Sequence, residues 1–392
     1  MIKLMKNTFY NEEKTKKSLC DFIMQADRLS MYKKCIEFEE RFSEYQGRKH
    51  SVLFNSGSSA NLALIQALLN LGILNKDDNV GFSALTWSTN VMPLIQLGLN
   101  PIPIDVSLKN LNVNSENLLE VLKKENLKAL FITNLLGFCG DLNKIKEICD
   151  QEGIILLEDN CESLGSEFDG TKLGNFGLAS TYSFFVGHHL STIEGGMVCT
   201  DSKELHEELL ILRAHGWSRD SSEEMRLKLK NKHNTKGFHE PYTFYQLGYN
   251  LRPTEITGFI GVEQLKYIDE IHQKRRDNFN EYYKYANNNP DFIKLDFSNM
   301  DFISNFAYPI ICKNKETLNE YKKKFFNVEI RPIVGGSMTK QPFFKYNEYS
   351  CPNAEMIHEN GFYIPNNPDL TNEEINTICN LLESDSEKNL EI

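Results

Sequence analysis

From about residue 50 to residue 200, short apolar runs alternate with longer segments whose apolar residues recur with helical spacing. The short runs predict strands, at residues 51–54, 79–84, 101–106, 129–134, 154–157 and 178–185. The longer segments predict helices, such as residues 59–71, 115–124 and 142–152. Strands that alternate with helices indicate an α/β fold with a mostly parallel sheet covered on both faces.

After residue 200 the pattern predicts a loop, a long helix and a second domain. Residues 218–236 are highly charged and are expected to form an exposed, mobile loop. Pro253 suits the first turn of a helix, and apolar residues then recur with the helical period, at Ile256, Phe259, Ile260, Leu265, Ile268 and Ile271. We therefore predict an N-terminal arm (1–20), a large domain (21–252), and a region (253–392) that contains this long helix and a smaller α+β domain. The polar tail from residue 384 is expected to fray.

Composition excludes several classes of function. A chain of 392 residues is long enough for two domains, and its net charge of −11 disfavours a nucleic-acid partner. No apolar run approaches the ~20 residues of a membrane span, and the first residues lack the apolar run of a signal peptide. A cytoplasmic location is therefore expected. The nine cysteines lie ten or more residues apart, so they lack the paired spacing of a zinc site or an iron–sulfur cluster and are interpreted as mostly structural thiols.

A small-residue turn between a predicted strand and a predicted helix has the composition of a phosphate site. It reads Asn55-Ser56-Gly57-Ser58-Ser59-Ala60-Asn61. Small residues let backbone amides approach an anion, and the helix N-terminus adds partial positive charge. The same residues also suit an ordinary helix start with a serine N-cap, so both interpretations stay open on these residues alone.

Carboxylates follow the predicted strand at residues 154–157, in the run Glu158-Asp159-Asn160-Cys161-Glu162-Ser163. Open α/β sheets bind ligands at the carboxyl ends of their strands. A carboxylate at this position can keep a pyridinium nitrogen protonated. The alternative is that Asp159 merely caps a helix.

A further motif reads Ser183-Phe184-Phe185-Val186-Gly187-His188-His189 and closes with Glu194-Gly195-Gly196-Met197. Together with the Gly57 turn, Trp87 and Asp159, in that order, it resembles the pyridoxal phosphate enzymes of fold type I, within them the nucleotide-sugar aminotransferase family. In that pattern a lysine four residues after the first Phe holds the cofactor as a Schiff base. Here the position holds His188, whose imidazole cannot form one. The chain therefore resembles the sugar 3-dehydratases that carry histidine at this position.

Other segments extend this resemblance over residues 20–385. They are Arg213-Ala214-His215-Gly216-Trp217, Gly248-Tyr249-Asn250 with Arg252-Pro253, and Arg331-Pro332-Ile333-Val334. The resemblance implies the fold-type I architecture, a large domain with a mostly parallel sheet and a smaller C-terminal α+β domain. Departures from the pattern occur at Phe184, Gly187 and residues 335–338, which are candidates for altered substrate contacts.

The resemblance also implies roles for individual residues in binding pyridoxal phosphate. The amides of Ser58 and Ser59, beside Gly57, and the hydroxyl of Ser183 are expected to hold the phosphate. Trp87 is expected to stack on the ring, although a lone Trp is more often a core residue.

Asp159 is expected to pair with the ring nitrogen, and Glu162 to lie near the ring hydroxyl. Asn250 resembles an asparagine that reaches the phosphate from the neighbouring subunit, which implies a homodimer with shared active sites. Arg213, His215 and Arg331 are candidates for substrate contacts, with a surface ion pair as the alternative for Arg331.

The implied reaction uses pyridoxamine phosphate to remove the 3-hydroxyl of a nucleotide-linked 4-keto-6-deoxyhexose, and L-glutamate then restores the cofactor's amine form. GDP-4-keto-6-deoxy-D-mannose is the first candidate substrate, and the nucleotide (GDP, CDP or dTDP) stays open. His188 is the expected acid–base catalyst, whereas His189 is expected to point elsewhere. No metal or iron–sulfur cluster is expected. The alternatives are a nucleotide-sugar 4-aminotransferase and a catalytically silent regulator on the same fold.

Overall fold

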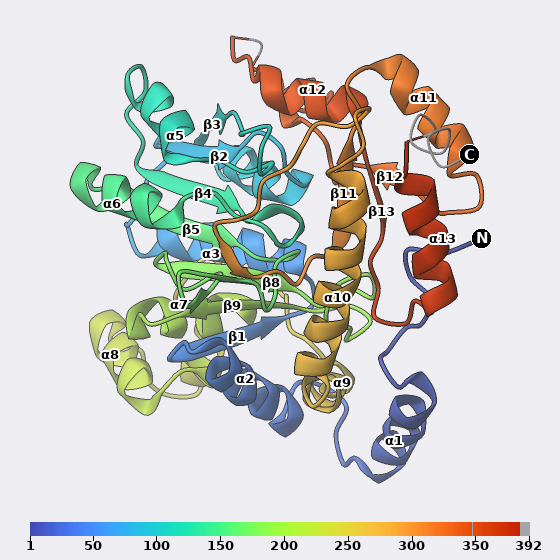
Figure 1. Cartoon of the computed structure of the whole chain (residues 1–392). Coiled ribbons are helices and arrows are strands. Elements are labelled where there is room, and N and C mark those ends of the chain that lie inside the picture. Colours follow the sequence, from blue (N-terminus) through green and yellow to red (C-terminus); the bar gives the residue numbers. More distant parts are fainter. Residues whose placement is uncertain (347, 385–392) are drawn as a thin grey trace, which may run out of the picture.

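The computed structural model describes residues 1–346 and 348–384, so the predicted tail lies, apart from Ser384, outside the described residues. Its centre is a seven-stranded sheet with the order β1-β9-β8-β5-β4-β2-β3 (Figure 1). The strands are β1 (His50–Phe54), β2 (Asn79–Ser83), β3 (Asn100–Ile104), β4 (Ala129–Thr133), β5 (Ile155–Asp159), β8 (Ala179–Ser183) and β9 (Gly196–Thr200). Only β9 runs antiparallel to its neighbours, so the predicted mostly parallel sheet and its six strands are confirmed. The pattern missed β9, whose apolar stretch is three residues long.

Helices cover both faces of this sheet, as predicted. Alternate residues of each strand point to opposite faces. Ala129 and Phe131 pack with α3 (Gly57–Asn70) and α7 (Lys203–Arg213) on one face. Leu130 and Ile132 pack on the other face, in the core that also receives α5 (Ser115–Leu122) and α6 (Leu142–Glu152). At the β1 end of this second face, α2 (Lys33–Gln46) and α9 (Glu255–Leu265) complete the cover.

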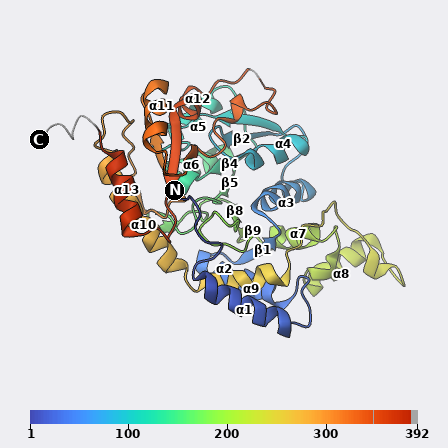
Figure 2. The ribbon, with the colours of Figure 1, turned by 90° about the vertical axis from the view of Figure 1, so that its right-hand side faces the viewer.

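The C-terminal part forms a second, smaller sheet beside the carboxyl ends of the parallel strands. Its order is β11-β13-β12, all antiparallel, and the strands are β11 (Ala307–Ile311), β12 (Arg331–Pro332) and β13 (Gly361–Pro365). The helices α10 (Ile268–Ala286), α11 (Lys315–Lys324), α12 (Pro352–Asn360) and α13 (Asn372–Leu382) surround it. Figures 1 and 2 place the N-terminus beside α13, where Lys6 pairs with Glu374 at 2.8 Å.

The domain boundaries expected at residues 20 and 252 stay a prediction, and α1 (Glu12–Gln25) crosses the first of them. Among the described residues, no helix combines the length and the apolar character that crossing a membrane requires.

The loop predicted for residues 218–236 is wrong, because most of it is the helix α8 (Glu223–His233). The Ser222 hydroxyl accepts a hydrogen bond from the Met225 amide and caps the helix. Glu223 and Glu224 lie in the first turn and basic residues in the last, which is the charge order that stabilises a helix dipole. The charge that suggested a loop therefore belongs to an exposed, capped helix.

The single long helix predicted from Pro253 is also wrong. The chain forms two helices, α9 and α10, with a break at Lys266 and Tyr267. Thr254, not Pro253, begins α9, since its hydroxyl accepts a hydrogen bond from the Thr257 amide. The apolar period does not reveal the break because Leu265 and Ile268 on either side keep the helical spacing.

The helices α2 and α9 cross at very short range. A Cβ atom at Gly258 would lie 2.4 Å from the backbone nitrogen of Cys35, and one at Gly261 would lie 2.4 Å from the Phe38 ring. The Glu255 carboxylate at the start of α9 accepts hydrogen bonds from amides at the start of α2, those of Tyr32, Lys34 and Cys35. The two glycines of α9 thus allow it to approach α2 closely enough for Glu255 to cap the first turn of α2.

Replacing Gly258 by Ala tests this packing. In a helix interior Gly→Ala ordinarily stabilises a protein by roughly 0.5–1 kcal/mol. Here the added methyl group meets the backbone of α2, so we expect a loss of about 1–3 kcal/mol, as for other overpacked sites. Urea unfolding followed by circular dichroism measures the change, and a stabilised variant would show that the two helices do not touch here.

Candidate functional site

A cavity of about 340 Å³ lies where the carboxyl ends of the parallel strands face the small sheet. This is the edge at which open α/β sheets bind ligands. Eight of the residues predicted from sequence line it, namely Gly57, Ser58, Trp87, Asp159, Glu162, Ser183, His188 and Arg331. Four predicted residues do not, namely Ser59, Arg213, His215 and Asn250.

The turn after β1 is both a capped helix start and a possible anion site. Ser56 is the N-cap of α3, and its hydroxyl accepts a hydrogen bond from the Ser59 amide at 3.0 Å. The Ser59 amide is therefore engaged, which corrects the expectation that it faces a phosphate. The amides of Gly57 and Ser58 belong to the first turn, where a helix offers no acceptor of its own. They are the donors left for an anion.

Gly57 allows this helix end to touch strand β8. A Cβ atom at Gly57 would lie 2.6 Å from Cβ of Ser183, closer than two carbons can approach. The Ser183 hydroxyl consequently lies beside the first turn of α3, and both line the cavity. Any larger residue at position 57 would separate the two groups that the sequence assigned to a phosphate.

Asp159 is a buried carboxylate held by two donors. Its Oδ2 accepts a hydrogen bond from Asn61 Nδ2 at 2.9 Å, and its Oδ1 accepts one from the Cys161 amide at 2.8 Å. It is the last residue of β5, so the helix-capping alternative is wrong. Glu158 points to the other face, where its carboxylate accepts amide hydrogen bonds from Gly174, Phe176 and Gly177.

Asn61 was not predicted as a site residue. It is fully buried on α3 and also lies 3.3 Å from the carbonyl oxygen of Thr89. The helical spacing gave the only signal for it, since a polar residue interrupts an apolar face one turn after Gly57.

Glu162 is positioned by an unusual backbone. Its Oε2 accepts a hydrogen bond from the Leu136 amide at 3.0 Å, and Leu136 adopts the left-handed region with φ 55°. Burial raises the pKa of Glu162 to about 8, although the Leu136 amide opposes the rise, and the charge of Asp159 adds to it. At neutral pH this carboxyl is therefore largely protonated and able to donate a hydrogen bond.

His188 faces the cavity between two aromatic rings. Its ring lies edge-on to Phe185 and to Phe306, with centroid distances of 6.0 Å and 5.2 Å. Nδ1 lies 3.3 Å from the carbonyl oxygen of Ser183, which can only accept, so this contact places the proton on Nδ1 and leaves Nε2 basic. Burial lowers the pKa of His188 to about 4, and the positive charge of Arg275 also lowers it. The imidazole is thus neutral at pH 7.

His189 points away from the cavity, as predicted. Its Nε2 lies 2.7 Å from the carbonyl oxygen of Ser304, and its side chain is buried. Phe184, a candidate for altered substrate contacts, is also buried, against Phe38 and Phe42. Strand alternation places it on the core face, so that expectation is wrong, whereas Gly187 does line the cavity.

Trp87 is 54% exposed and lines the cavity, so the core interpretation of this residue is wrong. The loop at residues 335–338 packs behind it, since a Cβ atom at Gly335 would lie 2.5 Å from the carbonyl oxygen of Thr86. An open indole face beside a buried carboxylate suits a flat, positively charged ring.

Arg331 fits both interpretations drawn from the sequence, a substrate contact and a surface ion pair. Its Nη2 pairs with Glu329 at 2.6 Å, and its side chain also lines the cavity beside Tyr363. Other lining residues were not predicted as site residues, and they include Leu4, Cys161, Phe306, Val334 and Tyr363. Cys161 is therefore an exception to the structural interpretation of the cysteines. Within the described ranges, no three acidic, histidine or cysteine side chains are grouped to hold a metal ion.

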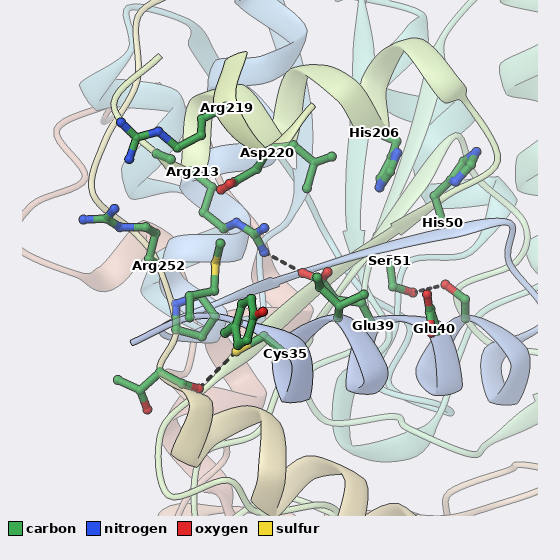
Figure 3. A pocket seen from close by; sticks show the side chains of 18 of the residues that line it. Cys35, Glu39, Glu40, His50, Ser51, His206, Arg213, Arg219, Asp220 and Arg252 are labelled. Carbon is green, nitrogen blue, oxygen red and sulfur yellow. Dashed lines mark hydrogen bonds and ion pairs between the residues drawn. The ribbon is translucent and has the colours of Figure 1, made fainter. Parts of the chain in front are cut away.

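Arg213 and Asn250 line a second, larger cavity of about 1260 Å³. It lies at the β1 edge of the large sheet, beside α2 and α7. Figure 3 shows Arg213 pointing toward Glu39, with which it pairs at 2.5 Å, and Arg219 and Arg252 at the same opening. Arg213 also donates to the carbonyl oxygen of Leu53. His215 adopts the left-handed region and lies beside Trp217. Within one chain, these residues do not reach the His188 cavity.

Comparison with known proteins identifies the family to which this chain belongs. The sequence matches the DegT/DnrJ/EryC1/StrS aminotransferase family over residues 11–383. GDP-4-keto-6-deoxy-D-mannose 3-dehydratase from Yersinia pseudotuberculosis is 34% identical over 371 residues, which cover 92% of this chain and 93% of that protein.

Two solved structures are similar throughout. GDP-4-keto-6-deoxy-D-mannose-3-dehydratase from E. coli with bound hydrated PLP has a TM-score of 0.86 and 33% identity, covering 98% of this chain and 99% of its own. A GDP-4-keto-6-deoxymannose-3-dehydratase with a trapped PLP-glutamate geminal diamine also has a TM-score of 0.86 and 33% identity, covering 98% and 100%. The expected α/β fold of the pyridoxal phosphate aminotransferases is confirmed.

The charge state of Glu162 is a direct test of this site without any ligand. Because burial raises its pKa to about 8, we expect a protonated carboxyl at about pH 6 that ionises as the pH rises through 8. An infrared difference spectrum between the wild-type protein and Glu162→Gln isolates its carbonyl band. The band should be present at the lower pH and absent above about pH 9. A Glu162 that is already ionised at pH 6 would contradict the desolvated geometry.

Proposed function

Because the chain belongs to the DegT/DnrJ/EryC1/StrS aminotransferase family, we propose that it is a pyridoxamine phosphate-dependent sugar 3-dehydratase. It removes the 3-hydroxyl of a nucleotide-linked 4-keto-6-deoxyhexose, with GDP-4-keto-6-deoxy-D-mannose as the substrate. L-glutamate restores the cofactor's amine form. The similar dehydratases named for this reaction, and their structures with PLP and a PLP-glutamate adduct, support the proposal. The product is a 3-deoxy ketosugar for the 3,6-dideoxysugars of surface polysaccharide.

One observation carries the choice of a dehydratase over an aminotransferase. His188 occupies the cofactor-lysine position and faces the cavity, and no lysine is among the described residues that line it. Without a lysine amine, the described residues of the wall cannot hold the cofactor as a Schiff base. The buried Asp159, the open face of Trp87 and the free amides of Gly57 and Ser58 argue against a silent regulator, which has no use for them.

The residues present fit pyridoxal phosphate. The amides of Gly57 and Ser58 and the Ser183 hydroxyl would hold the phosphate, Trp87 would cover one ring face, and Asp159 would pair with the ring nitrogen. When bound, the amine form supplies the nitrogen that joins the sugar ketone and the two electrons that replace the hydroxyl, and ammonia is released. The buried carboxylate of Asp159 would favour that chemistry because it would keep the ring nitrogen protonated.

His188 moves the proton. Its Nε2 is unprotonated at neutral pH, so it would accept a proton from the bound cofactor and substrate and would return it to the departing O3 of the sugar. Glu162, protonated by burial, would donate a hydrogen bond to the hydroxyl oxygen of the cofactor ring. Arg331, on the small sheet, faces the cavity from the opposite side and supplies donors for the anionic substrate. The aromatic rings of Phe185 and Phe306 flank the imidazole edge-on and help to orient it.

We also propose a homodimer in which Asn250 completes the partner's phosphate site. Within one chain Asn250 lies at the rim of the large cavity, away from His188. Several apolar side chains near this rim are exposed, among them Tyr32, Ile36, Tyr242, Phe244 and Leu247. A second copy of the chain would cover them, as closed two-fold assemblies do. The cytoplasmic location stays a prediction.

The reaction itself is tested by mass analysis of products. The purified protein is incubated with pyridoxal phosphate, glutamate and GDP-4-keto-6-deoxymannose. We expect a sugar nucleotide lighter by one oxygen together with free ammonia, and His188→Asn should abolish this product while the cofactor still binds. His189→Asn is the matched control and should retain the reaction. An amino sugar in place of the deoxygenated product would show that the chain is an aminotransferase.

Subunit complementation tests the shared site. His188→Asn and Asn250→Ala are each expected to be strongly impaired as homodimers. When the two variants are unfolded together and refolded, mixed dimers contain one site with both native residues, so we expect about a quarter of the wild-type activity. Mixing two batches of the same variant is the control. If the mixture stays inactive, Asn250 does not serve the neighbouring subunit.

A further inference from the structure

Arg275, in the middle of α10, is buried directly behind the turn that carries His188. It is 2% exposed. Its guanidinium donates to the carbonyl oxygen of His188 at 3.3 Å. It also donates to the carbonyl oxygens of Phe306 at 2.9 Å, Asn366 at 2.6 Å and Asn305 at 3.4 Å.

These acceptors belong to three segments that are distant in sequence. His188 lies between β8 and β9, Asn305 and Phe306 precede β11 of the small sheet, and Asn366 follows β13. The planar fork of arginine suits such divergent acceptors, whereas the three donors of a lysine spread from one nitrogen. The contacts join the catalytic turn to the small sheet.

Among the residues that the structure describes, no carboxylate is a close partner of the Arg275 charge. No acidic oxygen of the described residues lies within 4 Å of it, and all its acceptors are neutral carbonyl groups. Burying a cation in this way is costly, and it lowers the pKa of the arginine to about 10. A purely structural link between these segments would not need a full positive charge.

We propose that Arg275 is a positioning residue for the reaction, which fixes the imidazole of His188 relative to Phe306 and keeps positive charge behind it. The inference rests on the proposed function, since it assigns the catalytic proton transfer to His188. Phe306 is the residue whose ring meets the His188 ring edge-on at 5.2 Å, and Arg275 holds the backbone of both. Arg275 therefore helps to set their separation, together with the contact between His189 and the Ser304 carbonyl oxygen.

Other charged and titratable groups surround His188, and the test must take them into account. Across the cavity lie Asp159, Glu162, Glu194, Arg331 and Tyr363. Behind it, His189 and His272 are buried, and Asp369 faces Arg275 at longer range. Among them, Arg275 is the cation that lowers the pKa of His188.

Two substitutions separate position from charge. Arg275→Lys keeps the charge but loses the fork, so we expect kcat to fall about 10- to 100-fold, as a misplacement of about 1 Å does. KM for the sugar and the pH profile should stay close to wild type. Arg275→Gln removes the charge as well, so the acid limb of the kcat profile should move to higher pH, because a more basic His188 must lose its proton before it can accept another.

Arg276→Gln is the matched control, because the neighbouring guanidinium lies over the Phe302 ring and not behind His188. It should leave kcat and the pH profile unchanged. If kcat fell equally in Arg275→Lys and Arg275→Gln and the pH profiles stayed unchanged, the proposal would be overturned and Arg275 would be only a structural link.

A measurement without substrate keeps this test independent of the proposed reaction. NMR titration of the His188 ring in the cofactor-free protein should show a higher pKa in Arg275→Gln than in wild type and no change in Arg275→Lys. An unchanged His188 titration in Arg275→Gln would refute the electrostatic part even if no sugar substrate is turned over. Should Arg275→Gln not fold, Arg275→Met at the same position provides the neutral variant.

Discussion

The close contact between the start of α3 and the ends of β8 and β9 is the constraint on which the site depends. A Cβ atom at Gly57 would strike Ser183, and one at Gly196 would lie 2.2 Å from the carbonyl oxygen of Ser56. Two glycines therefore bring three backbone segments together at the carboxyl edge of the sheet. The first-turn amides, the Ser183 hydroxyl and the turn that carries His188 all follow from this one contact.

Burial acts on the acid and the base of this cavity in opposite directions. It raises the pKa of Glu162 to about 8 and lowers the pKa of His188 to about 4, because in both cases the charged form loses its hydration. Both groups are consequently neutral at physiological pH. The same environment thus prepares Glu162 to donate a hydrogen bond and His188 to accept a proton, without an ion pair between them.

Sequence reasoning was most successful where local pattern and chemistry coincide. The parallel strands follow from their apolar runs and Asp159 from its place at the end of one of them, whereas Ser183 and His188 follow from the resemblance of their motif to a known family. It failed where tertiary contacts decide. The break between α9 and α10 leaves the helical period intact. The Ser59 amide donates its hydrogen bond to the Ser56 hydroxyl, a contact that only the three-dimensional geometry of the helix cap reveals.

Two of the missed residues share a physical reason. Arg275 and Leu4 act on the site from elements far away in the chain, and no local spacing marks them. Phe184 shows the converse, since a position inside a recognised motif turns its side chain into the core. A motif therefore locates a site better than it orients each of its members.

The cavity is built from both ends of the chain. Leu4 lines it from an N-terminal segment whose amide bonds to Glu329, and Tyr363 lines it from the last strand of the small sheet. During synthesis on the ribosome the large sheet emerges well before β13 does, so the parallel strands can fold while the cavity still lacks one wall. The active cavity is consequently complete only after β13 has been synthesised. Chains that terminate before β13 would be partly folded but inactive.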